Sequence, residues 1–172
     1  MKKTITSFHG RSLIAAALVA GLLTLSACGF ALRGPVVFPF SSIYVGFPET
    51  SPLGSDLKRN IRANGKTVIA KDAKSADVVL DVLGETREKI ILSYNSQGRA
   101  REYNLLYNFR FRVVDKKGVE ILAPTSISMK RDISFNESQV LAKEAEEVLL
   151  YRDMQSDLVQ QIMRRLAVLN VE

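Results

Sequence analysis

The chain has 172 residues, of which 47% are apolar and 24% are charged, and its formal net charge is +6. A chain of this length fits one domain, which can bury about two thirds of its unfolded surface without a disulfide. Cys28 and His9 are its only cysteine and histidine, and both lie near the N-terminus. A Ser/His/Asp or Cys/His mechanism and a histidine-bearing zinc site are therefore excluded from the rest of the chain.

The N-terminal segment is typical of a secretory signal peptide. Three basic residues precede a mainly apolar run, residues 13–25, which ends in the small residues Ser26 and Ala27. The run is shorter than the roughly 17 to 25 residues that a membrane-spanning helix requires. We therefore expect residues 1–27 to be a cleaved signal peptide and expect no permanent transmembrane anchor.

The end of this segment, Leu25-Ser26-Ala27-Cys28, resembles the lipobox of bacterial lipoproteins. The resemblance implies lipidation at Cys28, with an S-diacylglycerol and an N-acyl chain, and no other cofactor. Gly29 stands where an Asp would retain a lipoprotein at the inner membrane, so we expect sorting to the periplasmic side of the outer membrane. Three of the 24 basic residues and none of the 18 acidic ones precede Cys28, so the mature net charge is +3. A charge this small does not favour nucleic acid as a partner.

The first elements of the mature chain are short. Four of the five prolines lie between residues 35 and 52, and this density favours extended backbone. We expect a lipidated tether over residues 28–40, a periplasmic domain over residues 41–172 and a short strand at residues 42–45. Leu57 and Ile61, four residues apart, predict an amphipathic helix over residues 53–64. Residues 68–70 either begin the next strand or only lead to it.

The middle of the chain predicts an antiparallel meander. From Tyr103 to Val113 apolar and polar residues alternate, which indicates a strand with one buried face. Residues 78–94 form a second β segment, joined to the first by the glycine-containing turn at residues 95–98. Residues 119–135 form a third, in which Pro124 indicates an edge position or a bulge.

The C-terminal segment predicts one long helix over residues 137–169. Asn136 followed by Gln139 resembles a capping box, which would open this helix. Apolar residues recur at helical spacing, so we expect one stripe that lies across the sheet. The stripe comprises Leu141, Ala145, Val148, Leu158, Ile162, Leu166 and Leu169.

Basic residues near the first predicted hairpin turn are candidates for ligand contact: Arg87, Lys89, Arg99 and Arg101. Such side chains can pair with phosphates, arginine in a bidentate way. Charged strand edges that block aggregation are an equal alternative. Lys143 lies in the first turns of the long helix, where the macrodipole disfavours a cation, although Glu147 would make it an ordinary surface lysine.

Catalysis and lipid storage have weaker support in the sequence. Four acidic residues could be imagined as a hydrolytic carboxylate pair, but neighbouring Arg and Lys explain the same charges, so we expect no enzyme. These residues are Glu85, Glu88, Glu102 and Asp132. The apolar face from Tyr103 to Val113 could line an acyl-chain cavity, but packing under the helices explains it more simply.

Residues 25–34, Leu-Ser-Ala-Cys-Gly-Phe-Ala-Leu-Arg-Gly, resemble the LptE family of lipopolysaccharide-assembly lipoproteins. The resemblance continues in the family's order through residues 60–65, 101–103, 138–143 and 164–166. It implies an α+β fold in β-α-β-β-β-α order, with a four-stranded, mainly antiparallel sheet and two helices on one face. It also implies a protein that plugs and helps to assemble the LptD outer-membrane β-barrel and binds lipopolysaccharide.

The resemblance extends to the ligand-contacting residues. Lys143 matches a lysine in the family's Leu-Ala-Lys stretch, while Ser96 departs from an expected Arg and Arg99 and Arg101 lie just beyond it. The expected lipopolysaccharide-binding set is Lys143, Arg99, Arg101, Arg87 and Lys89. The rival hypothesis is a free-standing lipid-carrier or assembly-factor lipoprotein without a barrel partner. A carrier would need an enclosed apolar cavity, whereas a plug should have a packed core and a polar outer sheet face.

Overall fold

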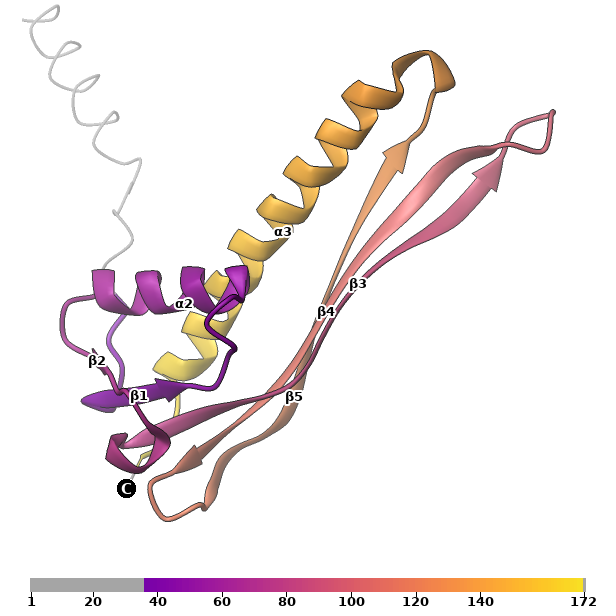
Figure 1. The fold of residues 1–172 in the computed structure, drawn as a ribbon. Coiled ribbons are helices and arrows are strands. Elements are labelled where there is room, and N and C mark those ends of the chain that lie inside the picture. Colours follow the sequence, from indigo (N-terminus) through magenta and orange to yellow (C-terminus); the bar gives the residue numbers. More distant parts are fainter. Residues whose placement is uncertain (1–35, 172) are drawn as a thin grey trace, which may run out of the picture. The chain divides into compact units, whose positions relative to one another are not determined.

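The computed structural model describes residues 36–171, which fold around one five-stranded mixed sheet with the order β2-β1-β3-β4-β5 (Figure 1). β1 pairs in parallel with both β2 and β3, and β3, β4 and β5 form an antiparallel meander. The elements are β1 (Ser42–Val45), α2 (Pro52–Ala63), β2 (Val68–Ile69), β3 (Val78–Tyr94), β4 (Ala100–Asp115), β5 (Glu120–Ser134) and α3 (Val140–Ala167), with short 3-10 turns at Ala73–Ser75 and Glu137–Gln139.

The expected α+β class is confirmed, but the four-stranded, mainly antiparallel sheet is wrong in detail. Residues 68–70 contain a strand of their own, because the amide of Val68 donates to the Ser41 carbonyl and the amide of Ala70 donates to the Ile43 carbonyl, both at 2.9 Å. This strand extends the sheet beyond β1, and the sheet is mixed because β1 runs parallel to both β2 and β3. Two residues are too few to produce a period of two, so alternation cannot reveal such a strand.

Helix α2 begins with a side-chain cap and buries one face. The Ser51 hydroxyl accepts from the amide of Gly54 at 3.0 Å, and Pro52 follows at the start of the helix. Leu57 and Ile61 are fully buried, as their spacing predicts. Gly54 is required here, since a Cβ at this position would lie only 2.5 Å from the Cβ of Phe47.

The packed core joins α2, the C-terminal half of α3 and the inner face of the sheet. The predicted alternation of β4 is confirmed, because alternate residues from Leu105 to Val113 are buried. From α3, Leu158, Ile162 and Leu166 are fully buried against them. Pro124 lies in β5, which is an edge strand with an irregular register near Leu122, as expected.

A register shift in β3 changes which of its residues face the helix. The shift falls between Val82 and Gly84. Before it, the even-numbered Val78 and Leu80 point into the core, whereas beyond it the odd-numbered Arg87 contacts α3. An extra residue in a strand moves every following side chain to the opposite face. The far half of β3 therefore presents charged rather than apolar residues to the helix.

The predicted apolar stripe is wrong for the N-terminal half of α3. Leu141 is 81% exposed, Val148 is 59% exposed, and Ala145 is also exposed. The helix is oriented there by polar contacts with the charged face of β3, which leave these apolar side chains facing outward. The capping box is also wrong, because Asn136 accepts from the amide of Ser138 in the 3-10 turn and Gln139 forms no side-chain cap.

Candidate functional site

The basic residues singled out in the sequence fall into two groups within one region, which we call the distal arm (residues 85–107 and 129–155). Arg87 and Lys89 lie on β3 and face α3. Arg101 is the second residue of β4, Arg99 directly precedes that strand, and Lys143 lies in the first turns of α3. The structure thus separates an inner pair from a group at the far end of the sheet.

Arg87 is held between two aromatic rings and two elements. Its guanidinium lies 4.4 Å from the ring centroid of Tyr107 and 5.7 Å from that of Tyr151. It donates to the Tyr107 hydroxyl at 2.9 Å and to Gln155 Oε1 at 2.8 Å. The Tyr107 hydroxyl in turn donates to Glu85 at 2.7 Å, and burial first, then this hydrogen bond, raises the pKa of Tyr107 well above its ordinary value.

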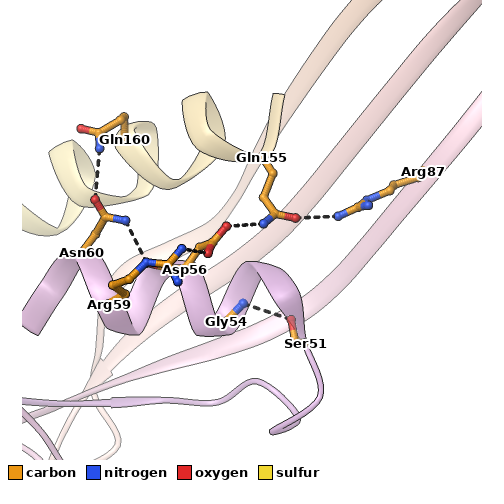
Figure 2. A network of polar contacts seen from close by, with 8 residues as sticks. All are labelled: Ser51, Gly54, Asp56, Arg59, Asn60, Arg87, Gln155 and Gln160. Carbon is orange, nitrogen blue, oxygen red and sulfur yellow. Dashed lines mark hydrogen bonds and ion pairs between the residues drawn. The ribbon is translucent and has the colours of Figure 1, made fainter. Parts of the chain in front are cut away.

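The same network continues into α2, as Figure 2 shows. The Gln155 amide donates to Asp56, which also pairs with Arg59. Arg87, Gln155 and Asp56 thereby connect β3, α3 and α2 where the apolar core ends. Arg87 therefore helps to position three elements against one another. That it also contacts lipopolysaccharide stays a prediction.

Lys89 is also engaged within the protein. Its ammonium group lies 2.5 Å from Glu147 of α3 and 4.4 Å from the ring centroid of Tyr103. We expected Glu147 to partner Lys143, and this pairing is wrong. Lys143 instead pairs with Glu146 at 2.8 Å and donates to the Ser134 hydroxyl at 3.3 Å. Only 16% of the Lys143 side chain is exposed, so it is less accessible than an ordinary surface lysine.

The far end of the sheet brings Arg101 and Lys143 into one neighbourhood. The amide of Phe135 donates to the Arg101 carbonyl at 2.7 Å, and Phe135 directly follows Ser134, the partner of Lys143. Arg101 is exposed, and within residues 36–171 its guanidinium has no hydrogen-bond or ion-pair partner. A surface hollow of about 300 Å³ lies beside it, lined by Asn95, Gln97, Ala100, Arg101, Phe135 and Asn136. Charge-assisted hydrogen bonds to a phosphate are the chemistry that such a cation supports.

Polar side chains line the outer face of the sheet, opposite the helices. The Ser128 hydroxyl donates to Asn108 at 2.6 Å, and the Asn108 amide donates to Thr86 at 3.5 Å. Farther along, Arg112 pairs with Asp81 at 3.0 Å. The Asn104 amide donates to Asp132, and the Ser93 hydroxyl donates to Glu102 at 2.6 Å. These pairs form a ladder of hydroxyl, amide and charged groups across β3, β4 and β5.

The acidic residues considered for catalysis do not converge. Glu85 is bound by Tyr107 on the inner face, whereas Glu102 and Asp132 are bound by Ser93 and Asn104 on the outer face. Among residues 36–171, no three His, Cys, Asp or Glu side chains are arranged to hold a metal ion. In the same range, every helix is too short or too polar to cross a membrane. Cys28 lies outside the described residues.

Sequence reasoning missed Gln155 and Tyr151, which complete the contacts of Arg87 and β3. The Tyr151 hydroxyl donates to the Glu88 carbonyl at 2.8 Å, and burial is the main cause that raises its pKa. The sequence contains a signal for Gln155, because this polar residue lies on the helix beside Met154 and Leu158, which are apolar and buried. A buried polar side chain needs a hydrogen-bond partner, and for Gln155 the sheet supplies Arg87.

Comparison with known proteins gives a consistent match over most of the chain. A family model for lipopolysaccharide assembly, LptE, matches residues 40–166. The LPS-assembly lipoprotein LptE of Pectobacterium atrosepticum is 29% identical over 159 residues, which cover 89% of this chain and 85% of that protein. The protein of the same name from Yersinia pestis is 30% identical over 156 residues, which cover 87% and 73%.

Solved structures agree with this match. The NMR structure of lipoprotein B from Nitrosomonas europaea superposes with a TM-score of 0.70 at 38% identity, covering 81% of this chain and 90% of that one. The crystal structure of rare lipoprotein B from Shewanella oneidensis gives 0.63 at 25% identity, covering 74% and 94%. The chain therefore belongs to the LptE family, lipoproteins of the Gram-negative envelope with a non-enzymatic role in lipopolysaccharide assembly.

Proposed function

We propose that this protein is anchored to the outer membrane by a lipid on Cys28, plugs and helps to assemble the LptD β-barrel, and binds lipopolysaccharide during its insertion into the outer leaflet. In this proposal the protein makes and breaks no covalent bond. Its sheet and helices fill the barrel lumen, and its basic side chains contact the phosphates of lipid A or of the core sugars.

The observation that carries the proposal is the polar outer face of the sheet. The lumen of an outer-membrane barrel is polar, so a protein that fills it needs a surface that exchanges hydrogen bonds with polar walls. The ladder around Asn108, Ser128 and Asp132 supplies such a surface across three strands. Its groups are already hydrogen-bonded to one another, which keeps the face ordered before any partner arrives.

Exposed apolar side chains on the distal arm also support the proposal that a large partner protein covers it. Leu141 and Leu149 on α3 are 81% and 55% exposed, and Leu92 on β3 is 53% exposed. Isolated exposed apolar residues are common, but several of them on one arm are typical of a surface that another protein covers. A barrel wall around this arm would remove them from water.

A free-standing lipid carrier fits the interior less well. The space between sheet and helices is filled by large, fully buried side chains, among them Tyr107, Phe109 and Phe111. Another hollow, of about 290 Å³, lies beside β1, and four of its eight lining residues are charged: Asp77, Asp115, Lys116 and Lys117. Acyl chains require an apolar and largely enclosed cavity, so neither feature favours a carrier.

Co-purification tests the barrel partner. The full lipidated protein, extracted from outer membranes in mild detergent, should bring down one large β-barrel protein. A photo-crosslinking residue placed at Asn108 or Ser128 should form a covalent adduct with that barrel. Recovery of the protein without any barrel, together with no adduct from the outer face, would overturn the proposed plug.

Substitution at the far end of the sheet tests the proposed ligand contacts. Arg101→Ser combined with Lys143→Ser should weaken lipopolysaccharide binding by ten-fold or more, since a charge-assisted hydrogen bond contributes roughly 1.5 to 3 kcal/mol. The matched control is Lys58→Ser combined with Arg110→Ser, which removes equal charge elsewhere. The difference between the two variants should shrink at high salt. Equal affinity of both variants would place the ligand contacts elsewhere.

A further inference from the structure

One end of the sheet gathers lysines that neither the core nor the proposed ligand contacts use. In the β2-β1-β3 part of the sheet the strands are parallel, and the start of β3 pairs with the end of β4, so Val78 lies opposite Asp115. The starts of β2, β1 and β3 and the β4–β5 turn therefore lie at a common end. Four exposed lysines lie there: Lys66 before β2, Lys74 before β3, and Lys116 and Lys117 in the turn. We call these four residues the lysine edge.

Local contacts hold the parts of this edge together. The amide of Lys116 donates to the Asp77 carbonyl at 3.1 Å, which joins the β4–β5 turn to the segment that carries Lys74. Asp77 accepts from the amides of Ser41 and Ser42 at 3.1 and 2.9 Å, which joins the same segment to the start of β1. The lysine edge is thus built on a hydrogen-bonded support.

Acidic side chains at this end accept hydrogen bonds from backbone amides, whereas the lysine ammonium groups do not take part in such bonds. Asp72 accepts from the amide of Ser75, and Asp115 accepts from the amides of Lys117 and Val119. Within residues 36–171, the ammonium groups of the lysine edge form no hydrogen bond or ion pair. The four lysines are matched in number by four carboxylates of the same end, so its formal net charge is zero (four minus four). These carboxylates are Asp72, Asp77, Asp115 and Glu120. Three of them accept from backbone amides, whereas the ammonium groups have no such partner among the described residues and are available to an external anion.

The chain enters the domain at the same end. Ser41 directly precedes β1. Farther back in the chain, the Val36 carbonyl accepts from the side-chain amide of Asn64, and Asn64 lies two residues before Lys66. Val36 follows Cys28 by eight positions, and an extended chain spans at most about 3.6 Å per residue, or about 29 Å in all. A lipid on Cys28 would keep Val36, the first residue of the domain at this end, within that distance of the membrane surface.

We infer that the lysine edge is a docking surface for anionic phospholipid headgroups of the leaflet that holds the lipid anchor. The inference rests on the proposed lipidation of Cys28 and goes beyond the proposed role in the barrel. Lysines near an anionic surface are attracted by its potential, which falls off within a Debye length, so they act only if the anchor keeps them close. Lipid and lysines together would hold the domain in one orientation against the bilayer.

A proximity measurement on the full lipidated protein tests this inference. A fluorophore attached to Ala73→Cys, an exposed residue beside Lys74, reports contact with quenchers carried on lipid headgroups. A second protein labelled at Ser156→Cys, an exposed residue of α3 outside both proposed sites, is the control position. We expect quenching at residue 73 to be stronger in phosphatidylcholine vesicles that contain phosphatidylglycerol than in vesicles without it, and to decline as salt is raised. The label at residue 156 should respond neither to phosphatidylglycerol nor to salt.

A charge-neutral variant sharpens the test. Replacing Lys66, Lys74, Lys116 and Lys117 by Gln should abolish the effect of phosphatidylglycerol, because each lysine is expected to shift the docked population by roughly five-fold. Replacing Lys58, Arg110, Lys130 and Arg152 by Gln removes equal charge elsewhere and should leave the effect intact. Equal loss in both variants, or equal quenching in both kinds of vesicle, would overturn the inference.

Two further measurements identify the cause of a failure. Flotation of the protein with vesicles reports whether the lipid anchor is present, independently of the lysine edge. If the protein floats and residue 73 shows no dependence on phosphatidylglycerol, the docking surface is wrong while the anchor stands. Inorganic phosphate at matched ionic strength should not reverse the quenching, and reversal by phosphate alone would assign the edge to a free anion instead.

Discussion

The two ends of this domain are stabilised by different interactions, although they share the same sheet and the same helix. Around α2 and the C-terminal half of α3, the interface is apolar, with Leu57, Phe109 and Leu158 almost fully buried. In the distal arm, the same helix is held by Arg87–Gln155, Lys89–Glu147 and Tyr151. The change coincides with the register shift between Val82 and Gly84. One extra residue in a strand can therefore replace an apolar interface by a polar one without ending either element.

A pair of leucine substitutions on α3 should show the largest contrast. Leu158→Ala removes a fully buried side chain and should lower the free energy of unfolding by about 2 to 5 kcal/mol. Leu149→Ala removes a side chain that is 55% exposed and should change it by less than about 0.5 kcal/mol. Denaturant unfolding of both proteins measures the contrast. Equal losses would mean that the distal half of α3 is packed as tightly as the proximal half.

The Arg87 network should give the next largest effect. Arg87→Met leaves Gln155 Oε1 without its donor, which should cost about 1 to 3 kcal/mol of unfolding free energy. Arg110→Met, on the exposed outer face, is the matched control and should cost little. A double-mutant cycle with Gln155→Met should show a coupling energy of at least about 0.5 kcal/mol. Strict additivity would show that the two side chains act independently.

The Lys89–Glu147 pair should contribute less and should depend on salt. Both side chains are partly exposed, so we expect a coupling energy of about 1 kcal/mol or less from a cycle of Lys89→Met and Glu147→Gln. The coupling should fall at high salt, because mobile ions screen partly exposed charges. The loss caused by Leu158→Ala should not fall in the same way. A salt-independent coupling would point to packing of the lysine stem on Tyr103 instead.

The smallest effect concerns Asp77, near the lysine edge. Hydrogen bonding to Ser42, opposed by partial burial and aided by the Ser41 amide and Lys116, holds the pKa of Asp77 below its usual range. Because the pKa of Asp77 is lower in the folded protein than in the unfolded chain, the ionised carboxylate stabilises the fold at pH values above about 4, its pKa in the unfolded chain. This stabilisation is lost as the pH falls through the pKa of Asp77 in the folded protein. Asp77→Asn should therefore lower the melting temperature slightly at pH 7 and leave it unchanged in strong acid. A larger deficit in acid would contradict this sign.

Elements with a strong period could be predicted from the sequence. The alternation from Tyr103 to Val113 identified β4, and the Leu57–Ile61 spacing identified α2. The two-residue β2 could not be predicted, because it depends on hydrogen bonds to β1 rather than on its own residues. The outward rotation of Leu141 and Val148 could not be predicted either, since it follows from a bulge in a distant strand.

The candidate site could be predicted only in part. Resemblance and position in the sequence indicate Lys143, Arg99 and Arg101. The end of β5 pairs with Arg101 and carries the partner of Lys143, which brings Lys143 and Arg101 into one neighbourhood. The same positive charge indicates Arg87 and Lys89, yet each of these side chains also has a partner on α3, more than fifty residues away in the chain. Composition cannot distinguish a cation that awaits a ligand from one that positions a helix.

Hydrogen exchange tests the central claim most directly. The claim is that polar side chains hold α3 against the sheet in the distal arm, and that a partner protein covers this arm. The full lipidated protein would be measured alone and after co-purification with the barrel. We predict that the amides of residues 140–152 of α3 exchange much faster than those of residues 154–166 in the free protein, and gain protection in the complex. Uniform protection along α3 in the free protein, or protection gained only by residues 154–166, would contradict the account.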